Sequence, residues 1–194
     1  GTWFLTLKTY LPDYEIIGVG RLTGIPLLGE STAIMYRKDK YDLVDSGHFW
    51  LSETPDEPSL GWDAACNRIC TYAILRDKET GCTYAHINVH FDHVGRVAQA
   101  ESVSLITAKI AEIAPDMPVV MTGDFNVDEG SPCYNALVEN GLRDTKFLAE
   151  KADNHSTYHG YHVVIPSTKP IDFIFTNPYV SSVKSYKIDS GFID

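Results

Sequence analysis

The fold is indicated most directly by the stretch Pro118-Val119-Val120-Met121-Thr122-Gly123-Asp124-Phe125-Asn126, an apolar run that leads straight into Gly-Asp-x-Asn. Its apolar part, Val119–Met121, predicts a strand, and Gly123 allows a tight turn where the strand ends. The carboxylate of Asp124 and the amide of Asn126 are separated by one residue, so both could reach a hard cation or a phosphoryl oxygen. The alternative is an Asx-turn, in which these side chains bond only their own backbone.

A second polar strand end precedes this one in the sequence. The segment Thr83–Val89 predicts a strand that ends within Asn88-Val89-His90-Phe91-Asp92-His93. The segment Arg96–Ala114 then carries apolar residues at steps of three and four, which predicts a helix that ends before Pro115. Because one helix joins the two strands, we expect the two polar clusters to lie near each other. Two histidines and an aspartate beside a second carboxylate favour phosphoryl or proton chemistry over packing alone.

The other expected strands are short and do not alternate regularly with helices. They are Glu15–Val19, Ala33–Arg37, Arg68–Leu75 and Ile171–Thr176. The strands Arg68–Leu75 and Thr83–Val89 are joined by a short polar link and predict a hairpin. This arrangement favours antiparallel or mixed sheets flanked by helices over a doubly wound parallel sheet.

A second, shorter helix is expected after the Gly-Asp-x-Asn turn. Ser131 has the side chain of an N-cap, and Pro132 suits the first helical position. Leu137 and Val138 are expected to face inward, and Gly141 is placed to close the C-terminal end.

The composition is that of an ordinary globular chain. Of the 194 residues, 44% are hydrophobic and 22% are charged, and 16 Lys and Arg against 26 Asp and Glu leave a net charge of −10. This acidic balance argues against a nonspecific nucleic-acid coat protein, which needs a basic excess. No apolar run approaches the ~18 residues that cross a bilayer. Since no linker or repeat divides the chain, we expect one domain over residues 1–194.

The cysteines and the first residues of the chain are informative about the cellular compartment rather than about the catalytic chemistry. Cys66, Cys70, Cys82 and Cys133 form no C-x-x-C pair and are too sparse for a disulfide framework, so buried free thiols are expected. The segment Gly1–Leu5 lacks the basic start and cleavage site of a signal peptide, and it has no initiator Met. We therefore expect the chain to begin inside a longer protein, and a soluble bacterial protein, cytoplasmic or secreted, is compatible with it.

Two further acidic residues have unusual sequence contexts. Asp172 interrupts the apolar run Ile171–Thr176, where an ionised carboxylate is costly unless a histidine, an arginine or a metal ion pairs with it. Glu30 follows Gly29 and is expected at the beginning of the strand Ala33–Arg37. By itself Glu30 could equally be an exposed charge at a sheet edge.

Taken together, these motifs resemble the endonuclease/exonuclease/phosphatase superfamily. This superfamily comprises metal-dependent phosphoesterases such as deoxyribonuclease I, apurinic-site endonucleases, neutral sphingomyelinases, inositol-polyphosphate 5-phosphatases and deadenylases. The pieces that carry the resemblance, in the order of the family, are Gly29-Glu30, Asn88–His93, Gly123–Asn126 and Ile171–Phe175. The phrase Phe49–Pro55, followed by Gly61-Trp62-Asp63 and Arg68, resembles the bacterial branch often labelled only as a family hydrolase.

The resemblance implies an α+β fold of two packed, mostly antiparallel β-sheets flanked by helices, the four-layer sandwich of deoxyribonuclease I. Its catalytic site would lie at one end of that sandwich. His90 would contact the scissile phosphate, and Glu30 would orient His90. Asp124 would activate or position the attacking water, Asn126 would hold a phosphate oxygen or the cation, and Asp172 would orient a further histidine.

The resemblance also implies a cofactor and substrate contacts. Mg²⁺ or Mn²⁺ would be held by Asp124 and Asn126 and would neutralise the charge that develops on in-line attack of water on phosphorus. Further expected substrate contacts are Arg68, His93, Tyr158 and His159. The partner is expected to be a phosphate ester, with a small molecule or a lipid headgroup preferred over nucleic acid, and no obligate protein partner is evident.

Two motifs of the family do not occur in the sequence. The metal-binding Glu of a Gln-Glu pair is expected just before Gly1, and a Ser-Asp-His motif is expected just after Asp194. By the family pattern the fold is therefore expected to be incomplete at both termini and to carry half of a catalytic centre. We expect this chain to melt at a lower temperature than a longer one that contains both motifs.

Two alternatives to a metal-dependent phosphoesterase remain open at this point. One is a pseudoenzyme, a phosphate- or metal-binding module without turnover. The other is a zinc-dependent hydrolase, because Asn88-x-His90-x-Asp92-His93 resembles part of the H-x-H-x-D-H motif. Asn88 replaces the first histidine of that motif, and zinc would have to bind through His90 and His93.

Overall fold

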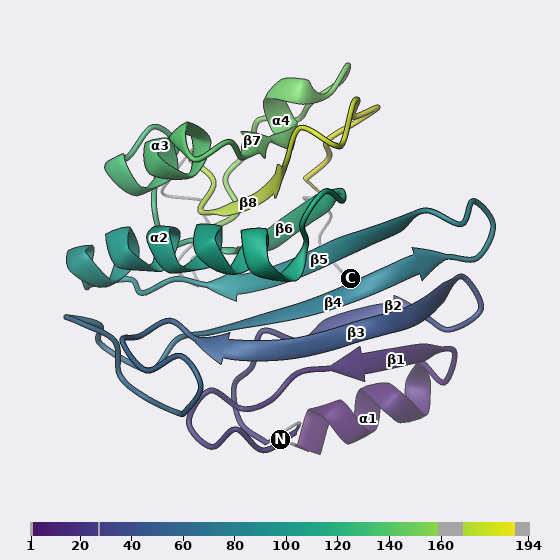
Figure 1. The fold of residues 1–194 in the computed structure, drawn as a ribbon, viewed down its shortest axis with the longest axis horizontal. Helices are drawn as coiled ribbons and strands as arrows, with labels where there is room; N and C mark the ends of the chain where they lie inside the picture. The colour runs from purple at the N-terminus through teal and green to yellow at the C-terminus, as the bar shows by residue number, and fades with distance from the viewer. Residues whose placement is uncertain (1, 27, 159–168, 189–194) are drawn as a thin grey trace.

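A computed structural model describes residues 2–26, 28–158 and 169–188 (Figure 1). Its elements, in chain order, are α1 Thr2–Tyr10, β1 Tyr14–Ile17, β2 Ile34–Arg37, β3 Tyr41–Trp50, β4 Ile69–Asp77, β5 Thr83–His90, α2 Arg96–Ile113, β6 Val119–Asp124, α3 Pro132–Glu139, β7 Arg143–Asp144, α4 Thr145–Leu148 and β8 Asp172–Thr176. None of the helices in these ranges is long and apolar enough to span a bilayer.

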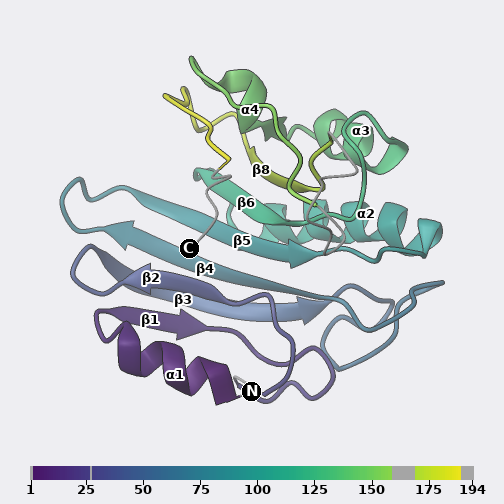
Figure 2. The same ribbon diagram turned by 180° about the vertical axis from the view of Figure 1, so that it is seen from behind.

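The strands form two sheets. The large sheet has the order β3-β4-β5-β6-β8-β7, in which only the β5–β6 pair is parallel, and β1 and β2 form a separate antiparallel pair. Helix α2 makes the crossover between the two parallel strands, as a parallel pair requires. In Figure 1, α2 and α3 cover the near face of the large sheet. The view from behind in Figure 2 shows β1 and β2 over the opposite face, with α1 alongside them. The expectation of two mostly antiparallel sheets flanked by helices is confirmed.

The main core lies between the large sheet and the helices α2 and α3. Val103 and Ile106, from the apolar stripe of α2, are fully buried against the strands. Beneath the ends of β6 and β8, Phe125 packs against Phe173 and Phe175 with ring centroids 5.7 and 5.3 Å apart. Burying a phenylalanine side chain stabilises a fold by about 1.5–3 kcal/mol. This aromatic cluster therefore holds the ends of two strands in one rigid position.

Four elements of the fold were not expected from the sequence: α1, β3 and the short β7 and α4. Strand β3 has no alternation of buried and exposed residues over most of its length, and a bulge interrupts its pairing with β4 between Leu43 and Asp45. Its extended conformation comes from nine residues that pair with β4, and a local pattern does not reveal this pairing. Helix α1 lies at the outside of the small sheet and contains β-branched and aromatic residues that disfavour helices.

The predicted helix after the Gly-Asp-x-Asn turn is confirmed in most of its details. The hydroxyl of Ser131 accepts a hydrogen bond from the backbone N–H of Tyr134, and Gly141 adopts a φ of 91° just after the helix. Leu137 is fully buried, but Val138 is 44% exposed, so the expectation that Val138 faces inward is wrong. A short helix has room for only one narrow apolar face.

The prediction of buried free thiols is correct for two of the four cysteines. All four are free, and Cys70 and Cys133 are buried, whereas Cys66 is half-buried and Cys82 is exposed. Burial in apolar surroundings raises the pKa of the Cys133 thiol to about 12. The buried thiol of Cys133 is therefore protonated at neutral pH and packs as a small apolar group.

Candidate active site

Three strand ends of the large sheet bring the predicted site residues together. His90 ends β5, Asp124 ends β6, and Asp172 begins β8. The register pairs His90 with Asp124 and Asp124 with Asp172. Paired residues on neighbouring strands project their side chains from the same face of a sheet. The topology thus gathers an imidazole and two carboxylates that are far apart in the sequence.

His90 lies between two carboxylates. Its Nε2 atom is 3.6 Å from Oδ2 of Asp124, and its Nδ1 atom is 3.4 Å from Oε1 of Glu30. Burial, helped by the nearby Arg68 guanidinium, lowers the pKa of His90 to about 4, although the Glu30 carboxylate opposes this shift. At neutral pH the ring is therefore uncharged, and it offers one N–H donor and one acceptor nitrogen.

Glu30 reaches His90 from the loop before β2, not from the beginning of that strand. The backbone N–H of Arg21 donates to the carbonyl oxygen of Glu30, and the Arg21 guanidinium binds Oε2 of Glu30 at 2.9 Å. The side-chain amide of Asn88 donates to the carbonyl oxygen of Ala33 and thereby ties the same loop to β5. Arg21 and Asn88 are positioning residues that sequence reasoning did not assign to the site.

The Gly-Asp-x-Asn turn combines the two interpretations that the sequence left open. An Asx-turn is present, because Oδ1 of Asp124 accepts the backbone N–H of Asn126 at 2.9 Å. The Asn126 side chain also donates from Nδ2 to the carbonyl oxygen of Phe91 at 3.0 Å. A Cβ atom on Gly123 would lie 2.0 Å from the carbonyl oxygen of Val89, and its φ is 153°, so only glycine fits there.

The site carries more negative than positive charge. Burial and the charge of Asp172 raise the pKa of Asp124, although the N–H bond from Asn126 opposes this shift. Burial also raises the pKa of Asp172, against the effect of a hydrogen bond with Thr157. Within the described ranges, neither carboxylate has an ion pair with a lysine or an arginine. Two carboxylates without a direct lysine or arginine partner are hard oxygen ligands that fit a divalent cation such as Mg²⁺ or Mn²⁺.

The loop before β8 helps to position Asp172. The Thr157 hydroxyl oxygen accepts the backbone N–H groups of Ile171 and Asp172, each at 3.1 Å. Tyr158 follows in the sequence, but it is 51% exposed and does not line the cavity described below. His159 lies outside the described residues.

A cavity of about 500 Å³ extends over these strand ends. Its lining residues are Ser31, Thr32, Asn88, Val89, His90, Thr122, Gly123, Asp124, Thr157, Asp172, Phe173, Ile174, Tyr186, Lys187 and Ile188. Behind His90, the Thr122 hydroxyl donates to the side-chain oxygen of Asn88 and lies 3.0 Å from Nε2 of His86. This polar chain fixes the residues that precede the site on β5 and β6.

Arg68, Asp92 and His93 form a hydrogen-bonded cluster beside the site. Asp92 is buried, and its carboxylate accepts the Nε–H of Arg68 at 3.2 Å and the backbone N–H groups of Val94 and Gly95. Burial alone would raise the pKa of Asp92, but these donors hold it below its usual range. The carboxylate of Asp92 therefore holds the beginning of α2 in place and does not project into the cavity over His90.

His93 is exposed and is oriented by the buried Arg68. Its Nδ1 atom lies 2.9 Å from Nη2 of Arg68, and because arginine only donates, Nδ1 is the acceptor. Potential ligand atoms of Cys66, Asp92 and His93 lie within 4.8 Å of one another. The Arg68 guanidinium already binds Asp92 and His93, so the three side chains of Cys66, Asp92 and His93 do not suit a metal cation. The same contact turns Nδ1 of His93 away from a shared zinc site with His90.

The chain matches no family-level sequence profile. It is similar to the crystal structure of a mannosyl-6-phosphatase of Bacteroides thetaiotaomicron VPI-5482, with 40% identity and a TM-score of 0.90 over 96% of this chain and 71% of that one. It is also similar to an endonuclease/exonuclease/phosphatase of Bacteroides vulgatus, with 42% identity and a TM-score of 0.89 over 95% of this chain and 72% of that one.

An uncharacterized protein of Acanthamoeba polyphaga mimivirus is 29% identical over 125 residues. That match covers 61% of this chain and spans only 45% of the viral protein. The two Bacteroides structures, in contrast, match nearly the whole chain at 40% identity or more and share its arrangement of sheets. This chain therefore belongs to the endonuclease/exonuclease/phosphatase family, whose characterised neighbour among these structures is a phosphatase.

Proposed function

We propose that this protein is a divalent-metal-dependent hydrolase of phosphate esters and that residues 1–194 form a single domain. The observation that carries the proposal is the meeting of His90, Asp124 and Asp172 at one end of the large sheet, with Glu30 beside His90. An imidazole among carboxylates in a cavity suits the binding of a phosphate together with a cation.

Glu30 lies beside Nδ1 of His90 and accepts the N–H of that nitrogen, so Nε2 is the nitrogen that faces the substrate. In the neutral ring Nε2 accepts a proton or a hydrogen bond, and once protonated it donates to an oxygen of the scissile phosphate. Asp124 orients the attacking water through its carboxylate and accepts a proton from it, which its raised pKa favours. Asp172 keeps its assignment as the carboxylate that orients a further histidine, and Thr157 holds it in place.

Asp124 and Asn126 are the residues that would hold Mg²⁺ or Mn²⁺. Because Nδ2 of Asn126 donates one N–H to Phe91, the amide oxygen is the atom that would bind a cation, and the second N–H of Nδ2 is the one that would bind a phosphate oxygen. When bound, the cation neutralises the charge that develops on the phosphoryl oxygens.

A small phosphomonoester is the proposed class of substrate. The net charge of −10 opposes tight nonspecific binding of a nucleic-acid backbone. The similarity to a mannosyl-6-phosphatase supports a sugar phosphate in particular. Lipid headgroups are the second and nucleic acids the third class of substrate in this proposal. The proposal applies to the whole protein.

The test is phosphate release from mannose 6-phosphate, an aryl phosphomonoester and an aryl phosphodiester by the complete protein. Each reaction is run with Mg²⁺, with Mn²⁺ and with EDTA. We expect the monoesters to be hydrolysed with either metal, and we expect EDTA and Asp124→Asn each to reduce the rate at least ~100-fold. Asp56→Asn, a matched change on an exposed loop, should leave the rate unchanged.

The experiment also decides between enzyme and pseudoenzyme. A wild-type protein that hydrolyses none of the three esters but binds inorganic phosphate in calorimetry would be a binding module. Activity that Zn²⁺ alone supports, and that requires both His90 and His93, would favour the zinc-dependent alternative instead.

A further inference from the structure

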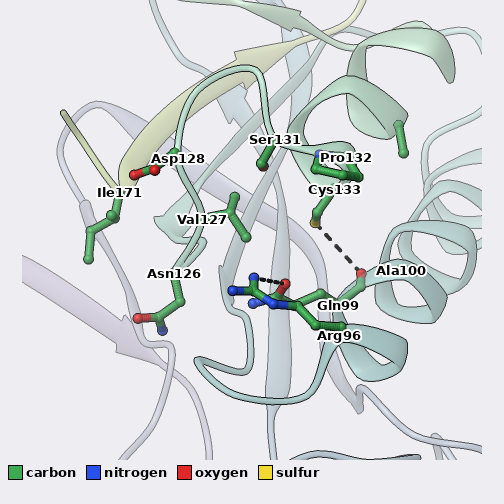
Figure 3. A pocket seen from close by; sticks show the side chains of 11 residues that line it. Arg96, Gln99, Ala100, Asn126, Val127, Asp128, Ser131, Pro132, Cys133 and Ile171 are labelled. Atoms are coloured by element: carbon green, nitrogen blue, oxygen red, sulfur yellow. Dashed lines mark hydrogen bonds between the residues drawn. The ribbon is translucent and has the colours of Figure 1, made fainter.

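A second cavity, of about 560 Å³, lies beside the candidate active site, between the beginning of α2 and the loop that leads to α3 (Figure 3). Its lining residues are Arg96, Gln99, Ala100, Asn126, Val127, Asp128, Ser131, Pro132, Cys133, Ala136 and Ile171. Of the residues that line this second cavity, Asn126 is the one to which the proposed function gives a role.

The two cavities are adjacent along the chain at two separate points. Asn126 lines the second cavity and lies two residues after Asp124, which lines the first. Ile171 lines the second cavity, and the next residue, Asp172, lines the first. Asn126, which is proposed to hold the cation or a phosphate oxygen, itself lines the second cavity, so a phosphate bound by Asn126 borders this space.

Arg96 is the cationic side chain that lines this cavity, and a hydrogen bond to a buried side chain holds its guanidinium in place. Its Nη1 atom donates to Oε1 of Gln99 at 2.9 Å, and Nε2 of Gln99 donates to the carbonyl oxygen of Asp92 at 2.7 Å. Gln99 is only 2% exposed, so the acceptor that orients the guanidinium is itself rigid. Figure 3 shows the guanidinium extending from α2 toward Val127 and Asn126. The other N–H donors of Arg96 thus face the side of the cavity that Asn126 and Val127 form.

The remaining walls offer groups of opposite polarity. The Asp128 carboxylate and the Ser131 hydroxyl line the loop side of the cavity, and Oδ2 of Asp128 lies 3.6 Å from Nζ of Lys169. The remaining Arg96 donors and the Ser131 hydroxyl suit a group with several hydroxyls, each of which can donate and accept. A long acyl chain would offer no acceptor to the Arg96 guanidinium.

We propose that this cavity receives the sugar or polyol group that is esterified to the phosphate and that Arg96 is its main specificity-determining residue. The proposal rests on the proposed function of the neighbouring site. It adds that selectivity for the leaving group is determined by α2 and by the loop 126–131, not by the strand ends that hold the phosphate.

The test compares two substrates that share a phosphate and differ in the leaving group, mannose 6-phosphate and methyl phosphate. In the complete protein with Mg²⁺, Arg96→Ala should lower kcat/KM for mannose 6-phosphate about tenfold or more, because a hydrogen bond from a charged donor is lost. It should change kcat/KM for methyl phosphate less than about twofold. Arg96→Lys should lower kcat/KM for mannose 6-phosphate by an intermediate factor, because the positive charge is kept but the planar set of guanidinium N–H donors is lost.

Two controls keep the result interpretable. Arg76→Ala removes an exposed arginine from β4, away from both cavities, and should change neither substrate. A thermal melt of Arg96→Ala should lie only roughly 2–4 °C below that of the wild type, because Arg96 is exposed and its removal costs mainly the hydrogen bond to the buried Gln99, about 1 kcal/mol.

The outcomes separate this inference from the proposed function. An equal loss on both substrates, or no loss on either, would overturn the subsite while leaving a phosphatase in place. Preferred hydrolysis of adenosine 5′-monophosphate with the same dependence on Arg96 would assign the cavity to a nucleoside and overturn the sugar. A wild type as inert as Asp124→Asn on every ester would refute the proposed function, and the subsite with it.

Discussion

Gly123 should be the least replaceable residue of the turn that carries Asp124. A Cβ atom at this position would lie 2.0 Å from the carbonyl oxygen of Val89, more than 1 Å inside the 3.4 Å at which ordinary contacts begin. Neither partner can move alone, because both belong to the parallel pair β5–β6. Gly123→Ala therefore has to push apart the two strands that present His90 and Asp124.

The expected loss of stability has two parts. A residue with a side chain at this positive φ costs about 1–2 kcal/mol, and forcing strands apart in a packed region costs about 1–3 kcal/mol more. A total of about 3 kcal/mol corresponds to a melting temperature lower by roughly 6–12 °C in a domain of this size. A displacement of ~1 Å at reacting groups can cost about 100-fold in rate, so kcat/KM should fall accordingly.

The assay pairs thermal unfolding by circular dichroism with phosphate release. Gly81→Ala is the matched control, because Gly81 has a φ of 74° and nothing lies within 4 Å of its added Cβ atom. That control should lower the melting temperature by only roughly 2–4 °C and leave activity unchanged. If Gly123→Ala proves no worse than Gly81→Ala in both measurements, the steric reasoning about the shared strand ends is wrong.

Three further predictions concern the residues around this turn. Asp92→Asn leaves the buried Arg68 without its carboxylate, so urea unfolding should show a loss of about 3–5 kcal/mol, and a loss below about 1 kcal/mol would contradict a structural role. Arg21→Ala frees the Glu30 side chain and should lower kcat about tenfold with a nearly unchanged melting temperature, whereas an unchanged kcat would mean that Glu30 needs no such support. His90 stays neutral in the folded protein down to about pH 4 but protonates near 6.5 when unfolded, so the unfolded state binds the extra proton in between and stability should fall as the pH falls through that window. His90→Gln should flatten this part of the pH profile in urea titrations, and an identical profile would refute the assigned shift.

The local sequence predicted the parts of the fold and site that depend on short-range rules. The strand at Val119–Met121, the helix from Arg96 and the capped helix from Pro132 each follow from periodicity or from a terminal residue within a few positions. The polar residues at the ends of two strands joined by one helix also predicted that His90 and Asp124 would meet. A parallel pair with a single crossover allows no other arrangement of those ends.

What the sequence could not decide depends on contacts between distant segments. Strand β3 has no apolar alternation, and only its pairing with β4 makes it a strand. His93 and Asp92 looked equivalent to His90 in the sequence, yet the guanidinium of Arg68 makes Asp92 a buried structural anion and turns His93 outward.

The same distinction applies to the residues that complete the site. Nothing near Arg21 in the sequence indicates that it would bind Glu30, and nothing near Arg96 indicates a cavity that begins at Asn126. A residue type and its spacing determine which chemistry is available. Burial, charge pairing and the shape of a cavity depend on which distant groups pack together, and they decide which of the available residues perform that chemistry.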